Sequence, residues 1–231
     1  MSMTRYLALL ENGDRVSRDE FERRYQQMPN LKKAELIEGK VYMPSPLRFE
    51  PHAEPHANII GWLWNYKLAT PGVRLGDNPT VRLDFDNEPQ PDAVLLIDAN
   101  AGGQTRIDED GYLAGAPEMV IEIAGSSASI DLFEKKQVYR RNGVKEYLVW
   151  QVIDRHLDWF YLKNEAYLSL RPNNEGVIRS QVFSGLWLNS SALIAGEMSV
   201  VMRTLHSGLA SPEHQQFLQQ LSRNDRGSQN R

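Results

Sequence analysis

The chain contains no cysteine among its 231 residues. This absence excludes a disulfide framework, a thiolate zinc site and a cysteine nucleophile, so any metal ion must be held by oxygen or imidazole ligands. The sequence also lacks a run of about 18 apolar residues, the length that a membrane-spanning helix needs. We therefore expect no membrane association. The N-terminal apolar stretch is too short and too soon polar for a signal peptide, which predicts a cytoplasmic protein.

The chain also has no excess of positively charged residues. Lysine and arginine number 26 and aspartate and glutamate 30, which gives a formal net charge of -4. This balance counts against a surface that holds nucleic acid by phosphate contacts alone. Nucleases, however, use acidic residues for metal ions and can confine positive charge to one cleft. Basic residues do gather between positions 135 and 145, either for such a cleft or as a solvated helix face.

The residue patterns predict an α/β fold with a mixed sheet of about five to seven strands flanked by helices. Dense β-branched runs at 92–97 and 119–124 predict two central strands buried on both faces. A further strand is expected at 146–152, and an antiparallel extension follows residue 157. Helices are predicted from Ser17, whose hydroxyl begins a capping box, and at 56–69 and 131–141.

Several segments are predicted to be turns or loops. The alternating residues 73–75 and 80–85 predict a hairpin, and 98–116 reads as a polar loop. Gly39 predicts a turn that either joins two short strands or links a helical turn to a strand. We expect one domain over residues 1–206, followed at 207–231 by a helix and a polar, partly disordered tail.

Two acidic residues in the predicted central strands are candidate metal ligands. Burying an ionised Glu122 within an apolar run is costly unless a positive group balances it. A Mg²⁺ or Mn²⁺ ion between Asp92 and Glu122 would do so, with the carbonyl of Ile123 as a further oxygen ligand. The alternatives are that Glu122 faces solvent or pairs with a basic residue, and that Asp92 merely begins a strand.

A lysine on the following predicted helix is a candidate partner for these acids. Asp131, Lys135 and Tyr139 are four residues apart and share one helix face, which either looks into the site or forms a surface ion pair. Lys136 points about 100° away on a regular helix, so the two lysines cannot serve one pocket equally.

Two rival sites have weaker support. His52 and His56 have zinc-helix spacing, but Pro55 is expected to disrupt the helix that would align them, and no third ligand is evident. A serine hydrolase would need a Gly-x-Ser-x-Gly elbow, which is missing, and Ser126 has no histidine at a recognisable spacing.

In order along the chain, these motifs resemble those of the Uma2 family. They are Glu-Leu-Ile-Glu-Gly-Lys-Val at 35–41, His56 with Ile59 and Leu63, Pro-Asp at 91–92, Ala-Pro-Glu-Met-Val-Ile-Glu-Ile at 116–123, Asp131-Leu132 with Lys135 and Tyr139, and Gly-Val-Lys-Glu-Tyr-Leu-Val at 143–149. The resemblance covers roughly residues 15 to 195. It implies a restriction-endonuclease-like fold of the PD-(D/E)XK nuclease superfamily.

The resemblance implies roles for particular residues. Asp92 and Glu122 would be the metal ligands, and Glu35 would be a third catalytic acid. The superfamily's usual lysine, two residues after the second acid, is replaced here by Ala124. The family pattern supplies Lys135 from the next helix instead.

Three further residues are implied as accessory. Glu38 could take the place of Glu35 as the third acid. His56 is expected to touch substrate or organise Glu35, unless it simply caps or packs its helix. Tyr139 shares the face of the catalytic lysine and is assigned to the same supporting group.

The implied activity is Mg²⁺- or Mn²⁺-dependent hydrolysis of phosphodiester bonds in nucleic acid, with DNA as the expected substrate. A homodimer would let two sites address two strands. The alternative function is a degenerate nuclease fold that binds nucleic acid or a protein without cutting it. A third is an accessory protein of a transposon or regulatory system.

Overall fold

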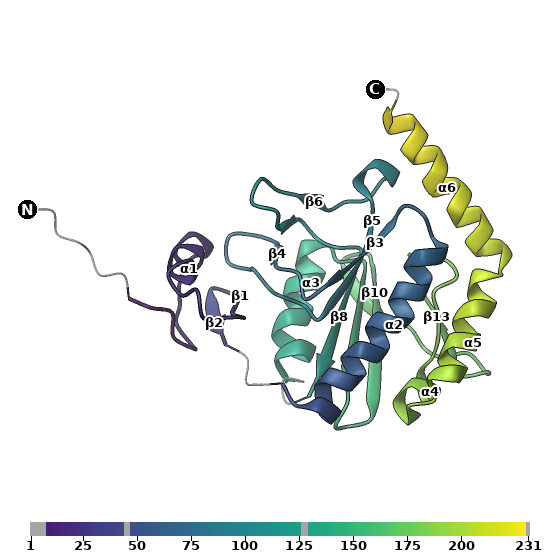
Figure 1. Cartoon of the computed structure of the whole chain (residues 1–231), viewed down its shortest axis with the longest axis horizontal. Coiled ribbons are helices and arrows are strands. Elements are labelled where there is room, and N and C mark those ends of the chain that lie inside the picture. Colours follow the sequence, from purple (N-terminus) through teal and green to yellow (C-terminus); the bar gives the residue numbers. More distant parts are fainter. Residues whose placement is uncertain (1–7, 44–46, 126–128, 230–231) are drawn as a thin grey trace, which may run out of the picture.

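A six-stranded mixed sheet forms the centre of the protein (Figure 1). The computed structural model describes residues 8–43, 47–125 and 129–229. In spatial order the strands are β11 (Ala166–Ser169), β10 (His156–Lys163), β9 (Glu146–Gln151), β8 (Met119–Ala124), β5 (Ala93–Ile97) and β3 (Val73–Asp77). β8 and β9 are parallel, and the other neighbouring pairs are antiparallel. The predicted mixed sheet is confirmed.

Helices cover both faces of this sheet. The helical segments are α1 (Arg18–Tyr25), η1 (Phe49–Ala53), α2 (Glu54–Ala69), η2 (Ala99–Ala101), η3 (Ile130–Lys135), α3 (Lys136–Asn142), α4 (Ser190–Ala195), α5 (Met198–Leu209) and α6 (Pro212–Gln229). The larger core lies between one sheet face and α2, α4 and α5, and α3 packs on the other face. Among the described helices, none is long and apolar enough to cross a membrane.

Strand alternation decides which side chains meet which helix. In β8, Met119, Ile121 and Ile123 join the larger core, whereas Val120 and Ala124 face α3. The strand is buried at every position, as its dense run of apolar residues predicts. Because successive side chains point to opposite faces, Glu122 is directed toward η3 and α3.

The N-terminal residues form a small unit with its own apolar cluster. Ser17 caps α1 by accepting a hydrogen bond from the Glu20 amide, as predicted. β1 (Glu35–Ile37) and β2 (Lys40–Tyr42) form the hairpin around Gly39, which settles the two alternatives left open for that turn. The cluster consists of Leu10, Phe21, Ala34, Leu36 and Val41.

The hairpin predicted over residues 73–85 is wrong. β3 pairs with β5, whereas β4 (Val81–Arg82) pairs with β7 (Leu113–Ala114), which also pairs with β6 (Arg106–Ile107). The chain leaves the main sheet at Asn78, where φ is 51°, and the following Pro79 has no amide N–H for a ladder. The segment predicted as a loop, 98–116, thus contains η2, β6 and β7.

The antiparallel run predicted after residue 157 is present, but β10 and β11 continue the main sheet. Its later strands, β12 (Val177–Arg179) and β13 (Trp187–Asn189), form a separate two-stranded sheet.

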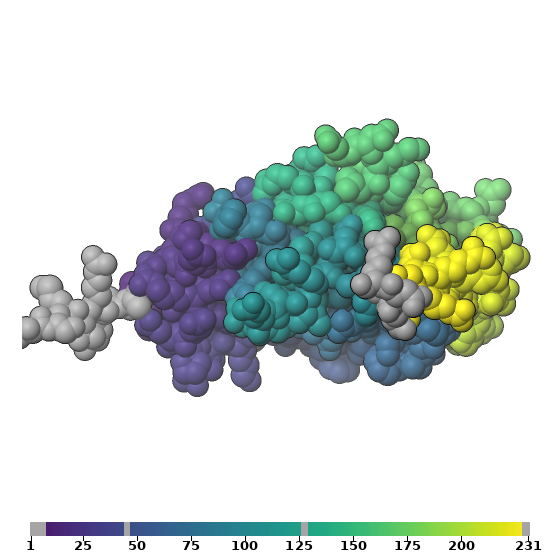
Figure 2. Space-filling model, turned by 90° about the horizontal axis from the view of Figure 1, so that it is seen from above, coloured from purple at the N-terminus to yellow at the C-terminus, as the bar shows by residue number. Residues whose placement is uncertain are grey.

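The C-terminal helix is longer than expected. The predicted partly disordered tail is wrong for residues up to Gln229, because α6 continues to that residue. Leu221 is buried, and the Asn224 side chain donates a hydrogen bond to the Ala101 carbonyl, so contacts with η2 hold this polar segment. In Figure 2, α6 (yellow) and the N-terminal unit (purple) lie at opposite ends of the molecule.

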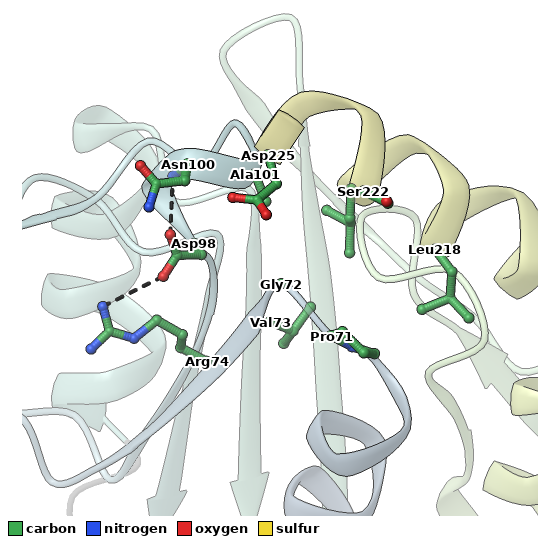
Figure 3. A pocket seen from close by; sticks show the side chains of 11 residues that line it. Pro71, Gly72, Val73, Arg74, Asp98, Asn100, Ala101, Leu218, Ser222 and Asp225 are labelled. Carbon is green, nitrogen blue, oxygen red and sulfur yellow. Dashed lines mark hydrogen bonds and ion pairs between the residues drawn. The ribbon is translucent and has the colours of Figure 1, made fainter. Parts of the chain in front are cut away.

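A pocket of about 590 Å³ lies between α6, η2 and the start of β3 (Figure 3). Gly72, Val73 and Leu221 are among its lining residues, and an ion pair between Arg74 and Asp98 lies beside them. Asp98 follows β5, whereas Asp92 precedes it. The pocket therefore lies at the opposite end of this strand from Asp92.

Glu88 links the N-terminal unit to the rest of the chain and predicts a pH dependence of stability. Burial and the nearby Glu22 raise the pKa of Glu88 to about 8, although Arg82 opposes this. The folded protein therefore keeps a proton that the unfolded chain loses above pH 4.5, and this stabilisation disappears as the pH rises through 8. Between these pH values, the unfolding free energy of the wild type should fall relative to Glu88→Gln by on the order of 2–4 kcal/mol.

Denaturant titration at several pH values measures this difference. Glu50→Gln, at an exposed carboxylate, is the matched control and should follow the wild type. If the unfolding free energies of Glu88→Gln and the wild type changed with pH in the same way, the raised pKa of Glu88 would be contradicted.

Candidate active site

Asp92 and Glu122 lie on the same face of the main sheet. Ala93 of β5 pairs with Ile121 of β8, so the next step along this antiparallel pair sets Asp92 opposite Glu122. The Ile123 amide donates a 2.7 Å hydrogen bond to Asp92 Oδ2, which fixes that carboxylate against β8. Both acids are buried, with 4% and 3% exposure. The structure thus brings together the two acids that the sequence selects.

Positive and polar groups surround the other oxygen of Asp92. His52 Nε2 lies 3.3 Å and Lys33 Nζ 3.8 Å from Asp92 Oδ1. Burial alone would raise the pKa of Asp92, but the hydrogen bond from His52, the charge of Lys33 and the Ile123 amide outweigh it and lower this pKa to about 2. Asp92 is therefore an anion at neutral pH.

Glu122 lies in a different environment. Its Oε1 accepts hydrogen bonds from Lys135 Nζ at 3.1 Å and from the Tyr139 hydroxyl at 2.8 Å. Complete burial raises the pKa of Glu122; Lys135 opposes this increase, while neighbouring carboxylates, including those of Asp131 and Asp92, add to it. Two adjacent acids are consequently held with pKa values shifted in opposite directions.

Lys135 lies at the centre of a group of carboxylates. Its Nζ lies 2.9 Å from Glu35 Oε1, 3.1 Å from Glu122 Oε1 and 3.6 Å from Asp131 Oδ1. Burial would lower the pKa of Lys135, but these carboxylates raise it well above its ordinary value. The predicted shared face of Asp131, Lys135 and Tyr139 therefore looks into the site. Lys136 turns away, with its Nζ 3.5 Å from the centre of the Phe160 ring.

The remaining predicted residues divide into two groups. His56 lies at the site, since its Nε2 is 3.0 Å from the Asp92 carbonyl oxygen and 3.1 Å from Asp77 Oδ1. Among the described residues, no hydrogen bond joins His56 to Glu35, so the expected contact between them is not seen. Glu38 is exposed and pairs with Arg141 at 2.6 Å, so the structure does not bring it to the carboxylates and Glu35 occupies the third position.

The expectation that Pro55 disrupts the helix that carries His52 and His56 is wrong. η1 runs directly into α2, with Pro55 in the first turn, and the rings of His52 and His56 lie 5.7 Å apart. Over the parts of the chain that the structure describes, no group of three or more histidine, aspartate or glutamate side chains is arranged to hold a metal ion. Ser126, the residue of the rival serine site, lies outside the described residues.

Sequence patterns missed two members of this site. Lys33 lies in the segment before β1 and carries no motif of its own, and His52 was considered only as a zinc ligand. The spacing of His52 and His56 was a usable signal, because it sets both side chains on one turn beside Asp92.

The donor chemistry fits a hard divalent cation. Mg²⁺ in proteins is usually held by one or two carboxylates together with water and substrate phosphates. Asp92 and Glu122 are neighbouring carboxylates, and Asp92 is ionised in spite of its burial. The two carboxylates are therefore of the ligand type that this class of ion prefers.

The Uma2 family model, described as "Putative restriction endonuclease", matches residues 18–191. The chain belongs to the Uma2 family. The match includes Glu35, Asp92, Glu122 and Lys135. It confirms the family resemblance and the restriction-endonuclease-like character of the chain.

A solved structure supports the same fold. The chain is similar to a crystal structure from Anabaena variabilis described as "a putative nuclease belonging to DUF820", with a TM-score of 0.55 and 15% sequence identity. The similarity covers 84% of this Uma2 chain and 99% of the other. At this identity it shows the nuclease-like fold alone. No curated protein matches the sequence.

Proposed function

We propose that this Uma2 protein is an endonuclease that uses Mg²⁺ or Mn²⁺ to hydrolyse phosphodiester bonds of nucleic acid, with DNA as the substrate. The observation that carries the proposal is the pairing of Asp92 and Glu122 on one sheet face, next to the ammonium of Lys135. The restriction-endonuclease-like family adds support. Two acids that can bind a divalent ion, next to a lysine that can stabilise negative charge, are the groups that metal-dependent phosphodiester hydrolysis requires.

In this reaction a water molecule gives up a proton as its oxygen bonds to phosphorus, the bond from phosphorus to the leaving sugar oxygen breaks, and that sugar oxygen takes up a proton. A divalent ion, when bound by Asp92, Glu122 and the Ile123 carbonyl, would supply an acidified water and charge neutralisation. The chain's own groups hold these ligands in place. The Ile123 amide and His52 fix Asp92, and Lys135 and Tyr139 fix Glu122.

A plasmid-cleavage assay tests this proposal. The wild type should nick or linearise DNA with Mg²⁺ or Mn²⁺ and stop when a chelator removes the ion. Asp92→Asn should retain the fold and lose on the order of 10²–10³-fold in rate, because the amide is no longer an anion. Asp98→Asn, at the other end of β5, is the matched control and should cut normally. Equal cutting by Asp92→Asn would refute the proposed site.

A second candidate function, nucleic-acid or protein binding without cleavage, is favoured by a specific observation. Glu35, Glu122 and Lys135 are at least nine-tenths buried and pair with one another. Ala124 also occupies the place of the superfamily's usual lysine. Protein that shifts DNA on a gel but never cuts it with either ion would support this candidate against the first.

A further inference from the structure

Lys33 is a second lysine at the candidate site. It precedes β1, and its Nζ lies 3.8 Å from Asp92 Oδ1 and 3.5 Å from Asn78 Oδ1. The Lys33 side chain keeps 23% of its surface exposed, against 6% for Lys135. Of the two ammonium groups beside the carboxylates, that of Lys33 is therefore the more accessible.

Lys135 is poorly suited to meet a substrate. An ammonium group has three N–H donors, and the Nζ of Lys135 lies within 3.6 Å of three carboxylates. Turning Lys135 toward a phosphate would leave buried anions such as Glu122 unpaired, which is strongly unfavourable. The geometry suits Lys135 to holding the acids in position.

Lys33 is bound far more loosely. Its 3.8 Å separation from Asp92 is an ion pair without a direct hydrogen bond, and its contact with Asn78 is long. Its donors can therefore turn to a new acceptor at little cost. A phosphate next to Asp92 would bring negative charge to this ammonium, and charge-assisted hydrogen bonds to phosphate oxygens are among the strong ones.

We propose that Lys33 is the residue that contacts the scissile phosphate of the nucleic-acid substrate, while Lys135 is a positioning residue for Glu35 and Glu122. This inference rests on the proposed nuclease function. It divides between two lysines the tasks that the family resemblance assigns to Lys135 alone.

The test compares Lys33→Ala with Lys32→Ala, which removes the same charge from an exposed neighbour. Binding of a fluorescein-labelled DNA duplex is measured by anisotropy across a salt series without divalent ions. Loss of one phosphate contact should reduce the slope of log Kd against log salt by about 0.9. Lys33→Arg should restore the slope, and Lys32→Ala should match the wild type. A purely structural role of Lys33 would not change this slope.

Cleavage and metal binding complete the experiment. Lys33→Ala should lower kcat by on the order of 10²–10³-fold, while the affinity for Mn²⁺, measured by calorimetry, stays close to that of the wild type. If the wild type cuts and Lys33→Ala behaves like Lys32→Ala in both slope and rate, the inference is overturned and the nuclease function stands.

The other outcomes are equally decisive. If the wild type binds DNA but never cuts, the nuclease function fails, and the salt slope alone decides the phosphate contact of Lys33. If the wild type neither binds nor cuts DNA, the inference is overturned together with the function.

Discussion

Lys135→Met is expected to lower the unfolding free energy by about 3–5 kcal/mol, because it removes the positive partner of a buried ion-pair group. Methionine fills a similar volume, so the loss reflects charge. Glu35, Glu122 and Asp131 lie within 3.6 Å of this ammonium and would face one another without it. In a chain of this length the melting temperature should fall by roughly 10 °C. Differential scanning calorimetry at pH 8 measures both quantities.

The control for this variant is its neighbour in sequence. Lys136→Met removes the same charge from a half-buried lysine that stacks on Phe160, and should cost about 1 kcal/mol or less. Adding Glu122→Gln to Lys135→Met should restore part of the stability, since one fewer buried anion then lacks a partner. A Lys135→Met protein as stable as the wild type would show that the carboxylates do not depend on this lysine.

Glu122→Gln should separate stability from activity. The amide oxygen can still accept the hydrogen bonds from Lys135 and Tyr139, and the neutral side chain avoids the cost of a buried charge. The unfolding free energy should therefore change by no more than about 1 kcal/mol. DNA cleavage should fall by on the order of 10²–10³-fold, because an amide is a poor ligand for a hard cation. Denaturant titration and single-turnover cleavage measure the two effects.

Glu118→Gln offers the reverse pattern with the same chemical change. The two carboxylate oxygens of Glu118 accept hydrogen bonds from the amides of Ile97 and Gln104, so the NH₂ group of glutamine must face an N–H donor. This variant should lose about 1–3 kcal/mol of stability and retain the specific activity of the folded protein. A Glu122→Gln variant that cuts at the wild-type rate would remove Glu122 from the catalytic set.

Local patterns were sufficient to predict the central elements of the fold. Apolar β-branched runs identified β5 and β8 because these strands are buried on both faces and tolerate few polar residues. The helix predicted at 131–141 is present, and Gly143 after it adopts the left-handed conformation that is typical of a helix C-cap. The face shared by Asp131, Lys135 and Tyr139 followed from helical spacing alone.

Contacts between distant segments could not be predicted in this way. β3 and β4 are short alternating segments whose partners are chosen by the rest of the sheet, so the nearest segment was the wrong choice. The end of α6 is polar, and Asn224 binds it to η2. No pattern in the neighbouring sequence indicates this contact. Lys33 and His52 contact Asp92 from two separate segments of the chain. Contacts of this kind leave no periodic pattern in the sequence.

The small N-terminal unit has a consequence for how the site is assembled. Its apolar cluster, which includes Phe21 and Leu36, belongs to that unit alone, yet it delivers Lys33 and Glu35 to the acids of the main sheet. Two backbone hydrogen bonds, from the Leu36 amide to the Glu88 carbonyl and from the Glu88 amide to the Leu36 carbonyl, help to attach this unit to the rest of the protein. Detachment of this unit would remove the Glu35 carboxylate and the Lys33 ammonium group from the candidate site. If the proposed function holds, cleavage should require this unit to stay attached to the main sheet, so local opening at this boundary would abolish activity before global unfolding.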